Sequence, residues 1–425
     1  MNAPTKSIDL SRVSKAAPIV GRRLRTEGRP RVALLGLFGC GNFGNDGSLE
    51  AMLNFLRQAR PQSELTCICA NPDLIGSRYD ISTLPISSAH APTARAPTRL
   101  GRARKLVEKL TDLYFTMKYI RRFDVVIVPG TGILDDFGER PYGMPWDIFR
   151  WCVGARLLGA KIAFVSIGAG PIKHPLSRRL MMWAARVAHY RSYRDVLSKD
   201  FVTAVGLKAA GDPVYPDIAF GLPAPQLTAP RDGARLTVGI GVMNYFGWYG
   251  FADGGKEIYE GYIGKLARFA VYVLDRGHNI RLLAGETTDA QAIADLTRRV
   301  LAERPKNANE RLTTEPAASL QDVMRQMSTT DIVVTTRYHN VVCALMLAKA
   351  TISLGYSKKN DYLMAEAGQS AYCQHVEDFD VDALIDQFER LRVSARDCEL
   401  MICAHGRDVK ARLKAQEAFL SAELL

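Results

Sequence analysis

The sequence predicts an α/β protein with two Rossmann-like domains that face a central cleft. Short apolar segments that suit buried strands alternate with amphipathic segments of helical length, which is typical of parallel sheets with helical crossovers. The alternation stops at residues 221–235, which are rich in proline and glycine, and then starts again. At 425 residues the chain is also long enough for two domains of ordinary size.

The alternation divides the chain into five parts. Residues 1–29 lack sustained apolar periodicity, so we expect a flexible basic tail there. The other parts are an N-terminal Rossmann-like domain at 30–222, a linker at 223–235, a C-terminal Rossmann-like domain at 236–395 and a C-terminal helical extension at 396–425. Ligands of open α/β sheets bind at the carboxyl ends of the strands, so site residues are expected directly after each strand.

Composition excludes several classes of protein. The hydrophobic content of 47% and the charged content of 24% are typical of a globular protein. No apolar run reaches the roughly 18 residues that a membrane span needs, and no apolar stretch follows the basic N-terminus as in a secretory signal. The eight cysteines are scattered without metal-site spacing, which favours a reduced cytoplasmic protein that binds no metal.

The net charge of +12 is concentrated in two segments. Residues 1–30 contain seven basic and two acidic residues, and residues 95–122 contain nine basic and two acidic residues. The balanced remainder argues against a nucleic-acid-binding protein. A helix at 103–121 has Leu106, Leu110, Leu113, Met117 and Ile120 on one face. We expect this face to pack on the sheet, and peripheral contact of the cationic helix with the inner membrane is the alternative.

A glycine-rich loop follows the first expected strand, at 32–37, and opens the first helix. Backbone N–H groups of such a loop can approach an anion at a helix N-terminus. We therefore predict a substrate loop, with a plain βα turn as the alternative; its residues are Gly41, Asn42, Gly44, Asn45 and Asp46. The loop is not a nucleotide fingerprint, because no acidic residue stands at the expected place after the second strand.

A second glycine turn follows the strand expected at 125–128. It contains Gly130 and Gly132, which we predict to contact substrate, and then Asp135 and Asp136. The two carboxylates can act as a base toward a sugar hydroxyl or simply cap the next helix, and the sequence favours neither.

Basic residues follow strands later in the chain. Arg194 opens a helix after a short strand and can grip a phosphate with its planar fork, although a surface pair with Asp195 is the alternative. Arg337 and His339 follow the strand expected at 331–335 and place a permanent cation beside a titratable proton donor. Lys359 follows the next strand and is expected to converge on them, with a capped turn of solvated charges as the alternative.

Four motifs in this order resemble those of the polysaccharide pyruvyl transferase family, which carries a Gly-Asn-x-Gly-Asp loop, an Arg-Asp-x-x-Ser element, an Arg-x-His junction and a Tyr-x-x-Lys segment. The corresponding residues here are Gly41-Asn42-Phe43-Gly44-Asn45-Asp46, Arg194-Asp195-Val196-Leu197-Ser198, Arg337-Tyr338-His339 and Tyr356-Ser357-Lys358-Lys359. Two departures are the extra Asn45 and a Gly-Thr-Gly turn at 130–132, where the family usually has three glycines. They leave the acceptor sugar open.

The resemblance implies a GT-B-like enzyme that moves pyruvate from phosphoenolpyruvate onto a sugar of an exopolysaccharide or cell-surface glycan, which is often lipid-linked, as a ketal. It needs no cofactor. In this scheme His339 is the acid, Arg337 and Arg194 bind the anion from the two domains, and Lys359 supplies a further donor. The base is Asp135, Asp136 or Asp46. A GT-B glycosyltransferase that uses a nucleotide sugar is the alternative enzyme, and an inactive assembly scaffold is the non-enzymatic one.

Overall fold

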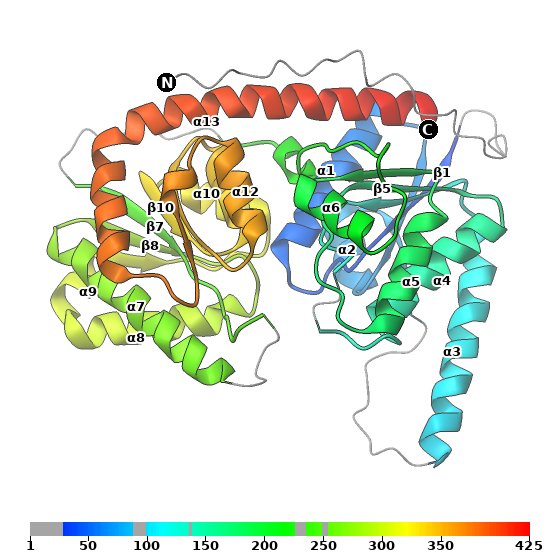
Figure 1. The fold of residues 1–425 in the computed structure, drawn as a ribbon, viewed down its shortest axis with the longest axis horizontal. Coiled ribbons are helices and arrows are strands. Elements are labelled where there is room, and N and C mark those ends of the chain that lie inside the picture. The colour runs from blue at the N-terminus through cyan, green and yellow to red at the C-terminus, as the bar shows by residue number, and fades with distance from the viewer. Residues whose placement is uncertain (1–28, 88–98, 136–137, 226–234, 249–253) are drawn as a thin grey trace.

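The computed structural model describes residues 29–87, 99–135, 138–225, 235–248 and 254–425. Within these ranges the chain forms two parallel six-stranded sheets, one in each half of the sequence (Figure 1). The predicted fold class of two Rossmann-like domains is therefore confirmed. The expected basic tail lies outside the described residues, apart from its last residue.

The two sheets have the same strand order. The N-terminal sheet runs β3-β2-β1-β4-β5-β6 and the C-terminal sheet runs β9-β8-β7-β10-β11-β12, so the first strand of each half lies in the middle. The strands of the first sheet are β1 (Arg31–Leu35), β2 (Glu64–Cys69), β3 (Ser82–Pro85), β4 (Val125–Pro129), β5 (Lys161–Ile167) and β6 (Tyr190–Tyr193). Those of the second are β7 (Thr237–Gly241), β8 (Asn279–Leu283), β9 (Leu312–Thr314), β10 (Ile332–Thr335), β11 (Ala350–Gly355) and β12 (Cys373–His375).

Helices cover both faces of each sheet (Figure 1). The N-terminal domain contains α1 (Phe43–Ala59), α2 (Pro72–Tyr79), α3 (Arg99–Ile120), α4 (Met144–Leu157), α5 (Pro175–Arg186), α6 (Val196–Ala204) and the 3-10 helix η2 (Ile218–Gly221). The C-terminal domain contains α7 (Gly255–Asp275), α8 (Asp289–Glu303), α9 (Pro305–Arg311), α10 (Leu320–Ser328), α11 (Tyr338–Met346), α12 (Lys358–Glu366) and the 3-10 helix η3 (Ser370–Tyr372). The last helix, α13 (Val381–Glu423), belongs to both domains.

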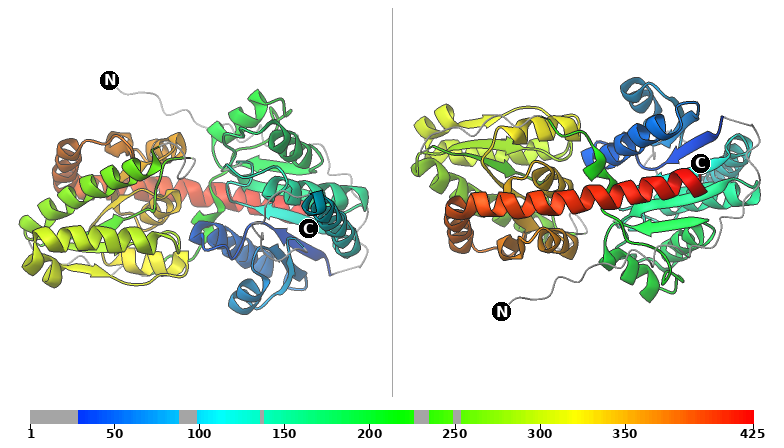
Figure 2. Two further views of the ribbon diagram at one scale, coloured as in Figure 1. Left: turned by 90° about the horizontal axis from the view of Figure 1, so that it is seen from below. Right: turned by 90° about the horizontal axis from the view of Figure 1, so that it is seen from above.

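α13 crosses from the C-terminal domain to the N-terminal domain, as all three views of the ribbon show (Figures 1 and 2). The sequence predicts one helix at 380–392 and a second at 406–421, but the structure has a single helix of 43 residues. Gly406 does not end it, because a single glycine costs a helix only about 1 kcal/mol. At its far end Gln416 donates hydrogen bonds to Ser166 and Ser192 of the N-terminal domain. α13 therefore ties the two domains together.

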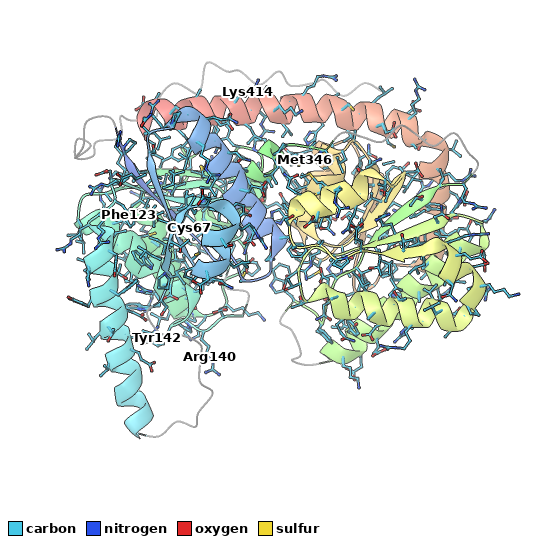
Figure 3. The ribbon with its side chains drawn as sticks, turned by 180° about the vertical axis from the view of Figure 1, so that it is seen from behind. Cys67, Phe123, Arg140, Tyr142, Met346 and Lys414 are labelled. Carbon is cyan, nitrogen blue, oxygen red and sulfur yellow. The ribbon has the colours of Figure 1, made fainter. Side chains whose placement is uncertain are left out.

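The two domains also share one apolar cluster beneath α13. It joins side chains of α1, α10, α11 and α13, among them Leu49, Val323, Val341 and Leu413. Met346, labelled in Figure 3, packs against its edge. Apolar burial on this scale favours the closed arrangement of the two domains that is seen here.

α3 projects from the N-terminal domain, and Phe123 lies near its attached end (Figures 1 and 3). The expectation that its leucine face packs on the sheet is wrong for two positions, because Leu110 and Leu113 are exposed. Ile120 of the same face is buried as expected, together with Thr116, where the helix contacts α4. None of the helices in the described part of the chain is long and apolar enough to cross a membrane.

Candidate active site

Five polar side chains from both domains meet at the domain interface: Asp135, Arg194, Asp217, His339 and Lys359. We call them the interdomain cluster. Arg194 follows β6, and its guanidinium lies 4.1 Å from the ring centroid of Tyr338 in the other domain. Asp135 follows β4, and its Oδ2 lies 3.8 Å from Nζ of Lys359 at the start of α12. The parallel strands of each sheet end at this interface, which is why residues distant in sequence come together.

Asp217 joins the two domains within this cluster. Its Oδ2 accepts a hydrogen bond of 2.9 Å from Nη1 of Arg194 and lies 3.7 Å from Nε2 of His339. Its Oδ1 accepts the backbone N–H of Ala219, so Asp217 also caps η2. Burial alone would raise the pKa of Asp217, but His339, Arg194 and this N–H together hold it below its usual value. The carboxylate therefore stays ionised between a permanent cation and a titratable ring.

His339 is enclosed by the glycine loop of the opposite domain. A Cβ atom added to Gly44 would lie 2.0 Å from Nδ1 of His339, so only glycine permits this approach. Nε2 of His339 is buried and makes no hydrogen bond to any described residue. A buried ring nitrogen without a hydrogen bond is costly unless a ligand uses it, so His339 stays a candidate site residue.

Lys359 points into the cluster, whereas the neighbouring Lys358 is exposed. Only 13% of the Lys359 side chain is accessible. Burial, together with the nearby Arg194, lowers the pKa of Lys359 to about 8, although Asp135 acts in the opposite direction. Gly170 makes room for this pair, because a Cβ there would lie 1.9 Å from Oδ2 of Asp135.

Arg337 lies beside the cluster but is engaged elsewhere. Its Nε and Nη2 donate to the two oxygens of Asp289 at 3.0 and 2.6 Å, and its Nη1 lies 2.7 Å from Oε2 of Glu286. These two carboxylates belong to the segment that follows β8. The predicted role of Arg337 as an anion ligand stays a prediction, and this pairing counts against it.

The glycine loop docks on that same segment of the C-terminal domain. The N–H of Phe43 donates to the carbonyl of Gly285, and the N–H of Thr287 donates to the carbonyl of Gly41. Nδ2 of Asn42 donates to Glu286 at 3.4 Å. The glycines are therefore explained in this arrangement by close contact between domains, and the loop's predicted role in binding substrate stays a prediction.

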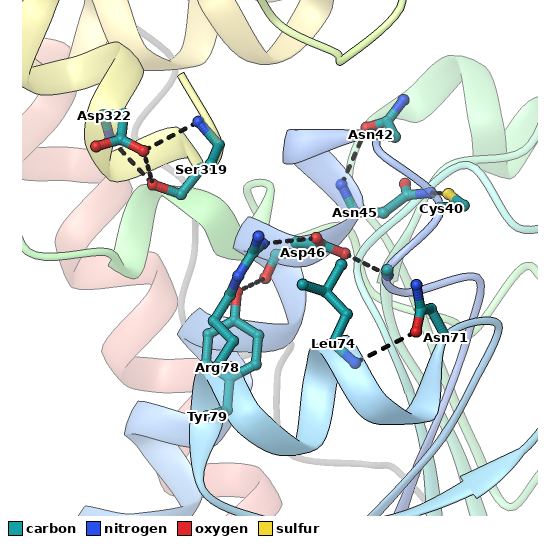
Figure 4. A network of polar contacts seen from close by, with 12 residues as sticks. Cys40, Asn42, Asn45, Asp46, Asn71, Leu74, Arg78, Tyr79, Ser319 and Asp322 are labelled. Atoms are coloured by element: carbon teal, nitrogen blue, oxygen red, sulfur yellow. Dashed lines mark hydrogen bonds and ion pairs between the residues drawn. The ribbon is translucent and has the colours of Figure 1, made fainter. Parts of the chain in front are cut away.

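Asn45 and Asp46 bond within their own domain (Figure 4). The N–H of Asn45 donates to Oδ1 of Asn42. The two oxygens of Asp46 accept from the N–H of Gly39 at 2.8 Å and from Arg78 at 3.0 Å. These contacts organise the loop and do not bring either side chain into the interdomain cluster, so Asp135 is the candidate base that the structure places there.

The turn after β4 supports Asp135. Gly130 and Thr131 have φ angles of 53° and 59°, and the N–H of Asp135 donates to the carbonyl of Gly132. The predicted contacts of Gly130 and Gly132 with substrate stay predictions. Asp136, the second candidate base, lies outside the described residues.

Tyr356 is a further residue of this interface, to which the sequence assigned no role. Burial raises its pKa, while Arg337 and Arg194 act to lower it and Asp135 and Glu286 to raise it further. Charges from both domains thus surround its hydroxyl. The sequence indicates a role for Tyr356 only through its place in the Tyr-x-x-Lys segment. For Asp217 the sequence indicates only a capping residue.

A sequence profile described as polysaccharide pyruvyl transferase matches residues 42–358. This match includes the glycine loop from Asn42 onward, the turn after β4 and every member of the interdomain cluster except Lys359, which follows its last residue. The chain belongs to the polysaccharide pyruvyl transferase family. It is accordingly a transferase, and its family acts in polysaccharide biosynthesis on a glycan acceptor. Among curated proteins, none matches the chain.

Solved structures share the fold of this transferase at low sequence identity. The UDP-GlcNAc 2-epimerase of Neisseria meningitidis, bound to UDP-GlcNAc, is 11% identical with a TM-score of 0.54, over 91% of this chain and 100% of that one. The epimerase of Methanocaldococcus jannaschii is also 11% identical with a TM-score of 0.54, over 85% and 92%. The lipopolysaccharide outer core galactosyltransferase WaaB is 12% identical with a TM-score of 0.52, over 91% and 99%. These likenesses confirm the GT-B-like fold.

The described residues of the transferase contain no group of three or more His, Cys, Asp and Glu side chains placed to hold a metal ion. The polar groups that converge are instead those that suit an anionic substrate: a guanidinium, an ammonium and an imidazole, with ionisable carboxylates beside them.

Proposed function

We propose that this transferase moves pyruvate from phosphoenolpyruvate to two hydroxyls of a sugar and releases phosphate. The observation that carries the proposal is the interdomain cluster, in which cationic groups of both domains face one another around buried carboxylates. A trianionic donor with a phosphate and a carboxylate needs cations from more than one direction. Family membership supports the same reaction.

The reaction needs one proton delivered to carbon. A proton adds to the methylene carbon of the enol phosphate, and a sugar hydroxyl attacks the adjacent carbon. The bond between that carbon and the phosphate oxygen then breaks, and the second hydroxyl closes the ketal. Of the two hydroxyl protons released, one balances the new methyl group and the other leaves with phosphate.

His339 is suited to deliver the proton to the methylene carbon. Its Nε2 makes no hydrogen bond among the described residues and lies 3.7 Å from Oδ2 of Asp217, which can hold the ring in one orientation. Arg194 and Lys359 are suited to bind the phosphate and carboxylate groups, because a guanidinium provides a fork and an ammonium a compact charge. Asp135, beside Lys359, is the proposed base for the sugar hydroxyls.

A thermal-shift assay separates this reaction from the alternative of a nucleotide-sugar glycosyltransferase. The likeness to a structure bound to UDP-GlcNAc is the observation that favours a nucleotide-sugar enzyme. We expect phosphoenolpyruvate to raise Tm and UDP to leave it unchanged. Phosphate release from phosphoenolpyruvate, over a panel of glycan acceptors, then tests turnover. Protection by UDP without protection by phosphoenolpyruvate would overturn the proposal.

The acceptor is proposed to be an exopolysaccharide or cell-surface glycan precursor, commonly lipid-linked, and the site of action the cytoplasm. All eight cysteines are free thiols, which suits a reducing compartment. Radiolabelled pyruvate transferred to an organic-soluble lipid fraction would identify a lipid-linked acceptor, and transfer only to water-soluble glycans would exclude it.

A further inference from the structure

The outer face of α3 exposes four large apolar side chains: Val107, Leu110, Leu113 and Tyr114. Their accessible fractions are 61%, 58%, 40% and 69%. The spacing is three residues from Val107 to Leu110 and from Leu110 to Leu113, and four residues from Leu110 to Tyr114. This spacing places the four side chains on one side of a helix with 3.6 residues per turn. Leu110 and Leu113 each stand seven residues before Met117 or Ile120, so they continue the side of the helix that packs on α4. They are exposed because this part of α3 extends beyond the body of the domain (Figure 1).

Exposure of this kind needs an explanation. Single exposed leucines are ordinary, but a row of four on a helix that leaves the body of the molecule is typical of an interaction site (Figure 1). Elsewhere in the described residues, α13 exposes Val393, Leu400 and Met401. Exposed large apolar side chains that stand singly in the sequence are Leu74, Tyr142, Leu157, Trp183 and Val196. The outer face of α3 therefore differs from them in the number of its members and in its projection.

The charge of the same helix indicates what covers this face. Residues 99–122 contain eight basic and two acidic residues, a net charge of +6. Lys118 and Arg122 lie on the described part of this segment and are exposed. A second copy of the chain would bring two such helices together against their like charges. An anionic bilayer surface instead attracts the basic residues and accepts the apolar ones.

We infer that the outer face of α3 docks on an anionic lipid bilayer. Leucine and valine enter the boundary between headgroups and acyl chains, and the ring of Tyr114 lies at headgroup level with its hydroxyl toward water. Lysine and arginine extend along the helix to reach the headgroups. The inference goes beyond the proposed reaction and does not depend on it, although such docking would hold the enzyme where a lipid-linked glycan is available.

Vesicle flotation with the full chain tests the inference. We expect the protein to float with vesicles of phosphatidylcholine and phosphatidylglycerol at low salt. Pure phosphatidylcholine vesicles and high salt should both weaken binding, because each basic residue near an anionic surface contributes roughly a fivefold gain in partitioning. The double variant L110E/L113E should lose at least about tenfold in binding, since even one buried leucine is worth that much.

The matched control is V393E/L400E, which places the same two charges at apolar positions of α13 that are 82% and 64% accessible. It should float like the unchanged protein. No flotation at low salt, or equal flotation of L110E/L113E and V393E/L400E, would overturn the inference. So would a dimer, seen by light scattering, that L110E/L113E dissociates without any loss of vesicle binding.

Phosphate release from phosphoenolpyruvate with a water-soluble acceptor is measured for each variant in parallel. Both variants should retain it, because neither pair of positions lies near the interdomain cluster. Docking without phosphate release would count against the proposed function alone, and release without docking against the inference alone.

Discussion

The surroundings of Arg194 and Arg337 differ in one decisive respect. Arg194 is buried and the side chain of Arg337 is 12% accessible, and both follow a parallel strand at the domain interface. Arg337 directs three nitrogens at two carboxylates of its own domain, whereas Arg194 donates one hydrogen bond to Asp217 and stacks on Tyr338 across the interface. Nε of Arg194 lies 3.7 Å from Oδ2 of Asp195 and makes no hydrogen bond within the described chain. Arg194 thus keeps an N–H group that can donate to an anion. The N–H groups of Arg337 are instead engaged with Asp289 and Glu286, in the segment that follows β8.

The largest expected effect is on turnover and concerns His339, which lies near Asp217 together with Arg194. We expect H339Q to lower kcat by about 10²–10⁴-fold, the usual contribution of a positioned acid, with little change in KM for phosphoenolpyruvate. Steady-state phosphate release measures both constants. A variant that raised only KM would show that His339 binds the donor and is not the acid.

The two arginines can be compared directly with matched lysine variants. We expect R194K to raise KM for phosphoenolpyruvate roughly 10- to 100-fold, the equivalent of about 1.5–3 kcal/mol for a hydrogen bond to a charged group. R337K should instead lower the free energy of unfolding by about 1–3 kcal/mol and leave KM nearly unchanged, since it disrupts the pairs with Asp289 and Glu286. Urea unfolding and steady-state kinetics measure the two effects. The reverse pattern would exchange the roles of the two residues.

For Lys359, the expected effect is a pH dependence of KM for phosphoenolpyruvate. With a pKa of about 8, its ammonium group is lost above that pH, so KM for phosphoenolpyruvate should rise from pH 8 to pH 9. K359R should remove this rise, because arginine stays charged.

The same pKa has a consequence for stability. The pKa of Lys359 in the folded protein lies below the usual lysine value of 10.5. Between pH 8 and pH 10.5, the unfolded chain therefore holds a proton on Lys359 that the folded chain has lost. This group therefore makes the protein more stable as pH rises from about 8 toward 10.5. Unfolding of K359M should lack that contribution, and an identical pH dependence in both proteins would contradict the assignment.

The smallest effect is expected at Thr131, in the turn that supports Asp135. Its φ of 59° lies in the left-handed region, where glycine has no steric penalty. T131G should therefore raise the free energy of unfolding by up to about 1 kcal/mol, less the entropy that glycine adds to the unfolded chain. Thermal unfolding detects this as a small increase in Tm. A clear decrease would show that Thr131 makes a contact that outweighs its strain.

Much of the fold could be predicted from local patterns. Apolar segments of strand length alternating with amphipathic ones determine parallel sheets, because handedness and connection length leave few other arrangements. Periodicity is less informative for α3, where apolar residues occupy both sides of the helix. It cannot tell where along the helix the contact with α4 ends, so Leu110 and Leu113 were assigned to the wrong environment. Likewise, no local signal distinguishes one long helix from two at residues 393–405, since α13 is completed by packing on the other domain.

The sequence by itself determined which residues stand at the ends of the strands, and hence that Arg194, His339 and Lys359 were candidates for one site. Only the tertiary structure decided what each of them faces. Asp217 reads locally as the cap of η2, and its place beside His339 exists only because the domains close on each other. The local sequence indicates that Arg337 is a free cation, but in the structure it forms an ion pair with Asp289, 48 residues earlier. Electrostatic partners are set by distance in space, which local sequence does not contain.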